Sequence, residues 1–133
     1  MAARILLIED NPANLELAKY LLEACGHTVL PAEDGREALD VLRRERPDIV
    51  ISDLQMPIMD GYEVLAHIRG NAELDALPVI ALTAFSMAGD CTKVLQAGFD
   101  GYLSKPIVPE AFVGEIEAFL KTGRRQGPLP DND

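Results

Sequence analysis

The chain has 133 residues, of which 48% are hydrophobic and 26% charged, as in a single soluble globular domain with its own core. Its formal net charge of −10 disfavours a nucleic-acid partner, because no basic stripe is present to meet a phosphate backbone. No apolar run is long enough for a signal peptide or a membrane span, so we expect a cytoplasmic protein without membrane contact. Cys25 and Cys91 lie far apart and are expected to be reduced thiols in or near the core.

Five apolar strand patterns alternate with five helical patterns along the chain. In chain order, the expected strands span residues 5–8, 27–30, 49–53, 79–82 and 101–103. The run over 49–53 is apolar apart from Ser52 until it reaches Asp53, which is typical of a strand buried on both faces. Between them, the expected helices begin at Asn11-Pro12, Asp34-Gly35, Gly61, Met87 and Pro109.

This alternation predicts right-handed βαβ crossovers and therefore an α/β fold, a doubly wound, five-stranded parallel sheet flanked by five helices. Gly26 and Gly98 stand where helices end with a cap glycine, and Pro47 stops the second helix. After Lys121 the hydrophobic period is lost. We expect one domain over residues 1–121 and a mobile tail over 122–133.

Four of the expected strands end at residues that can take part in chemistry. In chain order they are Glu9-Asp10, Asp53, Thr83 and Lys105. Any one of them alone would suggest only turn chemistry, but parallel strands bring their carboxyl ends together at one edge of the sheet. Three carboxylates in one pocket repel each other, and a hard divalent cation such as Mg²⁺ relieves that repulsion. With an ammonium and a hydroxyl added, the set suits phosphoryl transfer to a carboxylate.

Four segments resemble the receiver domains of two-component response regulators. They are residues 8–11 (IEDN), 53–61 (DLQMPIMDG), 81–84 (ALTA) and 102–107 (YLSKPI). Each alone is a weak match, but together and in this order they are specific, and the resemblance covers residues 4–121. It implies a flavodoxin-like or CheY-like sheet with strand order 2-1-3-4-5. With no output domain attached, the chain resembles single-domain regulators of the CheY and DivK type, and also receivers joined to hybrid kinases.

The resemblance implies a phosphoacceptor and a metal site. Asp53 is implied to attack the phosphorus of a phosphohistidine on a partner, and Lys105 to pair with a phosphoryl oxygen. Mg²⁺ is implied to bind Asp10, Asp53 and the backbone carbonyl of Gln55, with Glu9 acting through a metal-bound water. The Lys105–Pro106 peptide bond is expected to be cis.

The resemblance also implies a switch. Thr83 and the backbone N–H of Ala84 are implied to hold the phosphoryl oxygens, and Tyr102 to turn inward as Thr83 moves toward the phosphate. Phosphorylation then shifts the population between two packings of the domain and changes the surface formed by residues 87–121. We hypothesise that Phe85 obstructs the hydrolytic water, which a comparison of phosphate loss in wild type and Phe85→Ala would test.

The implied function is a signalling switch in a phosphorelay and not an enzyme that turns over outside substrates. The expected partners are a histidine kinase or histidine phosphotransfer protein as donor, and an effector protein that reads the switched face. We expect a monomer or a weak dimer.

Three other functions remain open for a chain of this class. A magnesium-dependent phosphohydrolase uses the same aspartyl phosphate, but usually has a second acid two residues after the nucleophile, where this chain has Gln55. An interaction module without phosphorylation has no need of all five strand-end residues. A flavodoxin-like electron carrier needs a Ser/Thr/Gly-rich loop after the first strand, which this sequence lacks. His27 and His67 have no companion ligands and are expected to be surface or partly buried structural residues.

Overall fold

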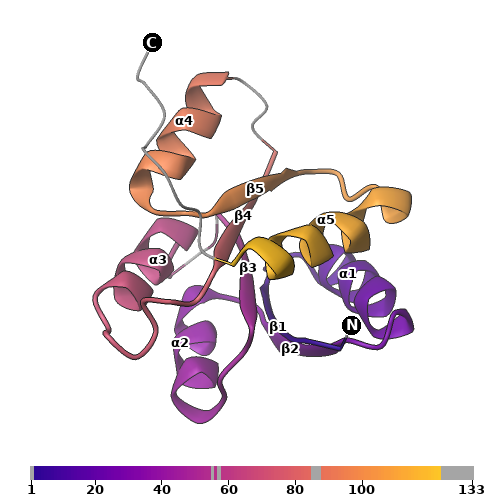
Figure 1. Cartoon of the computed structure of the whole chain (residues 1–133), viewed down its shortest axis with the longest axis horizontal. Coiled ribbons are helices and arrows are strands. Elements are labelled where there is room, and N and C mark those ends of the chain that lie inside the picture. Colours follow the sequence, from indigo (N-terminus) through magenta and orange to yellow (C-terminus); the bar gives the residue numbers. More distant parts are fainter. Residues whose placement is uncertain (1, 55, 57, 85–87, 124–133) are drawn as a thin grey trace.

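The computed structural model describes residues 2–54, 56, 58–84 and 88–123, which alternate between five strands and five helices (Figure 1). The strands are β1 (Arg4–Ile8), β2 (Thr28–Ala32), β3 (Ile49–Asp53), β4 (Val79–Thr83) and β5 (Gly101–Ser104). The helices are α1 (Pro12–Ala24), α2 (Gly35–Arg44), α3 (Gly61–Arg69), α4 (Ala88–Ala97) and α5 (Pro109–Thr122). All neighbouring strands pair in parallel in the order β2-β1-β3-β4-β5, so the predicted doubly wound sheet is confirmed.

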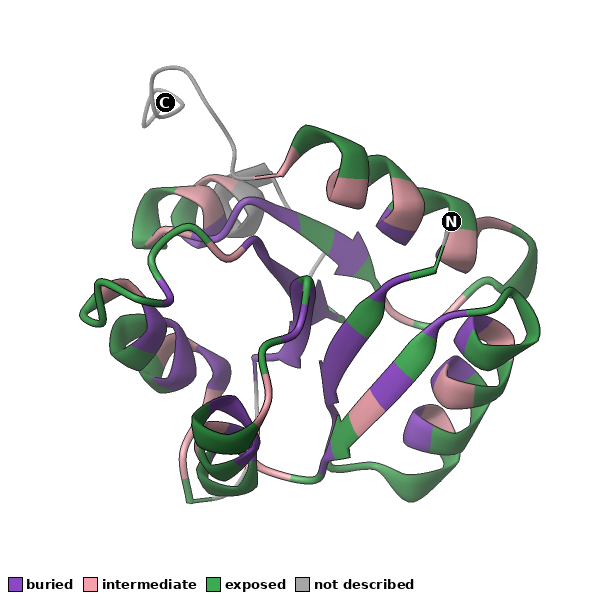
Figure 2. Ribbon diagram, turned by 60° about the horizontal axis from the view of Figure 1, so that its bottom comes forward, coloured by how far each residue is buried: buried purple, intermediate pink, exposed green. Residues whose placement is uncertain are grey.

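The sheet separates two hydrophobic clusters, one under each layer of helices. Along β1, Ile5 and Leu7 join the cluster beneath α1 and α5, whereas Leu6 and Ile8 join the cluster beneath α2, α3 and α4. This division follows from the pleat, which turns successive side chains to opposite faces. β3 and β4 are buried along their whole length because helices cover both of their faces (Figure 2). Each Leu or Ile buried in this way stabilises the fold by roughly 1.5–3 kcal/mol.

Side-chain caps fix the beginnings of the helices that follow β1 and β3. The Oδ1 atom of Asn11 accepts hydrogen bonds from the backbone N–H groups of Ala13 and Asn14, at 2.9 and 3.1 Å. Asp60 begins α3 through a reciprocal capping box with Glu63. Both strand-to-helix connections are therefore anchored at the carboxyl edge of the sheet.

The second strand is longer than its sequence pattern predicted. The pattern indicated residues 27–30, but β2 continues through Pro31 to Ala32. Proline is tolerated here because β2 lies at the edge of the sheet and pairs, among the described strands, with β1 alone. The outer side of β2 therefore has no neighbouring strand among those described that would need an N–H donor from Pro31.

Two side chains lie elsewhere than expected. Cys25 is exposed at the C-terminal cap of α1, so the prediction of a thiol in or near the core is wrong for this residue. The side chain of Cys91 is outside the described part of the chain. His27 is buried rather than at the surface: its Nδ1 accepts the N–H of Ala3 at 3.1 Å, and its Nε2 lies 2.8 Å from Oε2 of Glu117 on α5.

The last helix runs to Thr122, one residue beyond the expected domain boundary, and Gly123 caps it by donating its N–H to the carbonyl of Phe119. The remainder of the predicted tail, residues 124–133, lies outside the described residues. None of the helices described is long and apolar enough to cross a membrane.

Candidate functional site

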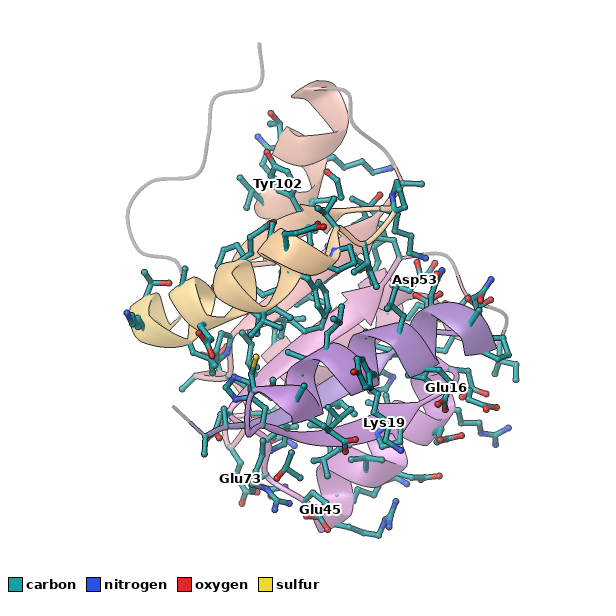
Figure 3. The ribbon with its side chains drawn as sticks, turned by 90° about the vertical axis from the view of Figure 1, so that its right-hand side faces the viewer. Glu16, Lys19, Glu45, Asp53, Glu73 and Tyr102 are labelled. Atoms are coloured by element: carbon teal, nitrogen blue, oxygen red, sulfur yellow. The ribbon has the colours of Figure 1, made fainter. Side chains whose placement is uncertain are left out.

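The carboxyl ends of β1, β3, β4 and β5 surround a cavity of about 400 Å³. Its lining includes the predicted strand-end residues together with parts of the neighbouring loops: Glu9, Asp10, Asn11, Pro12, Asn14, Asp53, Leu54, Thr83, Ala84 and Lys105. Figure 3 shows Asp53 at this end of the molecule, beside the start of α1. The strand-end residues were predicted to meet only from the rule that parallel strands end at one edge of a sheet, and the structure does bring them into one cavity.

Three carboxylates form the acidic side of the cavity. One oxygen from each of Glu9, Asp10 and Asp53 lies within 4.8 Å of the others. Glu9 and Asp53 are buried, with 1% and 5% of their surface exposed, whereas Asp10 is exposed. The two inner acids are therefore held out of water at a spacing at which their charges repel.

The ammonium of Lys105 lies between the two buried carboxylates. Its Nζ donates to Oδ2 of Asp53 at 2.9 Å and lies 3.1 Å from Oε2 of Glu9. The backbone fixes this position, because the N–H of Lys105 donates to the carbonyl of Thr83 at 2.8 Å. The Lys105–Pro106 bond is cis, as predicted.

The contacts among Lys105, Asp53 and Glu9 also shift the pKa values of Lys105 and Glu9. Burial lowers the pKa of the Lys105 ammonium, but its hydrogen bonds and charge interactions with Asp53 and Glu9 outweigh burial, and the pKa is raised above 10.5. The lysine therefore stays charged. The pKa of Glu9 is raised above 4.5, first by its burial and then by the charge of Asp53, despite the hydrogen bonds from Lys105 and Asn14.

The donor set around Glu9 fits a hard cation. Its Oε1 accepts from the backbone N–H of Asn11 at 3.3 Å, from Nδ2 of Asn14 at 3.4 Å and from Nζ of Lys105 at 3.3 Å. Its Oε2 is buried and accepts no hydrogen bond, although the ammonium of Lys105 lies 3.1 Å from it as an ion-pair neighbour. A buried carboxylate oxygen without a donor, beside two further carboxylates, matches the oxygen ligands and charge that Mg²⁺ requires.

Gly61 is a site residue that sequence reasoning treated only as the start of a helix. A methyl group at this position would overlap the backbone carbonyl oxygen of Asp53 and lie 3.0 Å from Cα of Leu54. The N–H of Gly61 donates to the carbonyl of Leu54 at 3.0 Å, which closes the loop after β3. The glycine therefore allows α3 to begin directly against the strand that carries Asp53. Asn14 was also missed, because its contact with Glu9 arises only when α1 folds back over β1.

The remaining predicted residues divide between the cavity and its surroundings. Thr83 is buried and Ala84 exposed, and both line the cavity. Tyr102 does not line it: it lies on β5, is 37% exposed, and borders a separate hollow of about 350 Å³ (Figure 3). Gln55 and Phe85, which were assigned a metal contact and a gating role, lie outside the described residues.

Comparisons with known proteins agree on one family. Residues 5–117 match the model of the response regulator receiver domain. The chain is 39% identical over 120 residues to the polar-differentiation response regulator DivK of Brucella anthropi, an alignment that covers 90% of this chain and 98% of that protein.

Solved structures give the same result. The chemotaxis response regulator CheY4 of Vibrio cholerae superposes with a TM-score of 0.84 at 29% identity, covering 89% of this chain and 98% of that one. The receiver domain of a sensor histidine kinase from Pseudomonas aeruginosa, with a magnesium ion coordinated in its active-site cleft, superposes with a TM-score of 0.78 at 34% identity. That alignment covers 92% of this chain and 98% of the other.

Proposed function

This chain belongs to the receiver domains of two-component response regulators, which are signalling switches, and on that premise we propose that Asp53 accepts a phosphoryl group from a phosphohistidine. One observation carries the proposal. The buried carboxylate of Asp53 faces a cavity and is held 2.9 Å from an ammonium that also pairs with Glu9. A carboxylate fixed in this way at an open cavity can act as a nucleophile, and the cation next to it can stabilise the charge of the incoming group.

In the proposed reaction, a carboxylate oxygen of Asp53 attacks the phosphorus of the phosphohistidine. The O–P bond forms as the N–P bond breaks, and the departing imidazole nitrogen keeps the bonding electron pair and takes up a proton. Lys105 pairs with one phosphoryl oxygen, while the hydroxyl of Thr83 and the backbone N–H of Ala84 donate to others. These donors lie where negative charge develops, so they lower the barrier without being consumed.

Mg²⁺ is the proposed cofactor. Asp10, Asp53 and the backbone carbonyl of Gln55 would hold it directly, and Glu9 would hold it through a water molecule. When bound, the cation neutralises the acidic cluster and the phosphoryl oxygens during transfer. The unsatisfied Oε2 of Glu9 supports this assignment.

The output is a proposed shift between two packings of the domain. The phosphoryl group adds about two negative charges, and drawing Thr83 toward them leaves room for Tyr102 to move inward. A switch from mostly inactive to mostly active needs about 5.5 kcal/mol of differential stabilisation. Several charge-assisted hydrogen bonds supply energy of that order. The surface that changes is α4, β5 and α5, and an effector protein reads it.

The cellular setting follows from the same proposal. A histidine kinase or a histidine phosphotransfer protein donates the phosphoryl group, and the chain acts in the cytoplasm as a monomer or weak dimer. Residues 1–121 form the working receiver. The chain catalyses only its own phosphorylation and dephosphorylation.

The experiment that tests the proposal is intact-mass spectrometry after incubation with acetyl phosphate, with and without Mg²⁺. We expect one phosphoryl group per chain in the presence of Mg²⁺, and none after EDTA treatment or in Asp53→Asn. Asp75→Asn, which alters an exposed acid on the α3–β4 connection, is the matched control and should behave as wild type. Equal phosphorylation of Asp53→Asn and wild type would refute the assignment.

A further inference from the structure

The carboxylate of Glu9 is held through one of its two oxygens. Its Oε1 accepts hydrogen bonds from the backbone N–H of Asn11 at 3.3 Å, from Nζ of Lys105 at 3.3 Å and from Nδ2 of Asn14 at 3.4 Å. Its Oε2 is buried and accepts no hydrogen bond from the described residues, although the same ammonium lies 3.1 Å away. A carboxylate fixed by one oxygen presents the other in a defined direction, and for Glu9 that other oxygen is the one available to a cation.

The two side-chain donors on Oε1 are not equivalent. Lys105 also pairs with Asp53 at 2.9 Å, and in the proposed reaction it turns to a phosphoryl oxygen. It is also a cation, so it repels a metal ion that approaches the same carboxylate. The amide of Asn14 is neutral, and it donates its hydrogen bond to Glu9. Asn14 can therefore hold Glu9 while a cation binds next to it and while Lys105 serves another anion.

The start of α1 fixes the side chain of Asn14. Its backbone N–H donates to Oδ1 of Asn11 at 3.1 Å, within the cap of the helix. Its side chain is half-buried, lines the cavity and reaches back to Glu9, five positions earlier. A residue held in this way loses little conformational freedom when it orients a neighbour. The donor is therefore in place before a metal ion arrives.

We propose that Asn14 is a positioning residue for magnesium: by holding Oε1 of Glu9, it keeps Oε2 turned toward the metal site. The proposal rests on the proposed function, because it presupposes that Glu9 serves Mg²⁺ through a water molecule. Asn14 itself contacts neither the cation nor the phosphoryl group. Outer donors that orient a metal-binding side chain contribute about 10–100-fold to metal affinity, and we assign such a contribution to this amide.

The test is isothermal titration calorimetry with MgCl₂ on the full chain after EDTA treatment and dialysis. Asn14→Leu and Asn14→Ala both remove the donor, the first at nearly the same size, and Asn14→Gln restores the amide on a longer side chain. Ala13→Leu is the matched control, because it places a leucine on the neighbouring residue of α1, which is exposed and does not line the cavity. Circular dichroism of the metal-free proteins establishes which variants are folded.

We expect Asn14→Leu and Asn14→Ala to bind Mg²⁺ about tenfold more weakly than wild type, because the carboxylate of Glu9 is then free to rotate. Asn14→Gln should recover most of the affinity, and Ala13→Leu should bind as wild type does. In a Lys105→Met background, Asn14 is the one described side-chain donor left on Oε1. Asn14→Leu should therefore weaken Mg²⁺ binding by a larger factor in that background than in wild type.

Wild-type affinity in the folded variants without the donor would overturn the proposal. An equal loss in Asn14→Gln or Ala13→Leu would also overturn it, because the effect would then belong to the shape of the helix start. So would a loss that is no larger in the Lys105→Met background, since the two donors would then not share Glu9. If wild type itself binds no Mg²⁺, this proposal and the metal assignment fail together. If wild type and Asn14→Leu bind Mg²⁺ equally, the positioning role fails and the metal assignment stands.

Discussion

Replacing Lys105 with methionine should destabilise the metal-free protein at pH 8 by about 3 kcal/mol. The ammonium lies 2.9 Å from Asp53 and 3.1 Å from Glu9, both of which are buried, and the substitution leaves two carboxylates without their cation. Removing one partner of a buried ion pair costs about 3–5 kcal/mol, and we expect the lower end because 20% of the lysine side chain is exposed. For 133 residues this loss lowers the melting temperature by about 10 °C.

The assay is urea unfolding followed by circular dichroism, repeated with Mg²⁺. A cation at tenfold excess over its dissociation constant adds about 1.4 kcal/mol to the unfolding free energy. Mg²⁺ should stabilise Lys105→Met more than wild type, because the ammonium no longer repels it. The deficit of the variant should also shrink as the pH falls toward 5, since the unpaired carboxylates then take up protons.

Lys121→Met is the matched control, because Lys121 is exposed in the last turn of α5 and should change stability by less than about 0.5 kcal/mol. A loss below about 1 kcal/mol for Lys105→Met would refute the view that the lysine compensates buried charge. Equal stabilisation of variant and wild type by Mg²⁺ would refute the proposed overlap of ammonium and metal site.

Three further predictions concern Glu9, a tightly packed glycine and a second buried ion pair. The folded chain binds the Glu9 proton more tightly than the unfolded chain, so metal-free stability falls as pH rises from 4.5 through the raised pKa. Glu9→Gln should abolish that fall in urea titrations, and an unchanged slope would contradict it. Gly101→Ala should lower the melting temperature by at least about 5 °C because the new methyl overlaps the Phe119 ring, whereas Gly114→Ala, with nothing within 4 Å, should not lower it. Arg69→Met should lower the free energy of unfolding in urea by about 3 kcal/mol, because Arg69 pairs with the carboxylate of Asp100, whose side chain is 1% exposed. A loss below about 1 kcal/mol would contradict this.

The sheet and the site were predictable because both depend on local patterns. Continuous apolar runs identify buried parallel strands, and the residues that end them must meet at one edge. Asp53 and Lys105 are 52 positions apart in sequence, yet their separation of 2.9 Å follows from the strand order. The unusual cis bond before Pro106 came from the family resemblance and not from any periodicity.

Features that depend on tertiary contacts were not predictable. The pattern ended the second strand at residue 30, because its continuation through Pro31 depends on the place of β2 in the whole sheet and not on the local sequence. The burial of His27 requires α5 to bring Glu117 to it. The backbone of Ile58 has a positive φ of 73°, which nothing in its own side chain favours. In each case the deciding partner is remote in sequence or lies in the backbone.

The most direct test of the central claim is to trap and locate the phosphoryl group. Sodium borohydride reduces an aspartyl phosphate to homoserine, so the protein is phosphorylated with Mg²⁺ present, reduced, digested and analysed by peptide mass spectrometry. We predict homoserine at position 53 and at no other acid of the cluster. Homoserine at Asp10, or a phosphorylated chain with position 53 unmodified, would contradict the assignment of Asp53 as the acceptor.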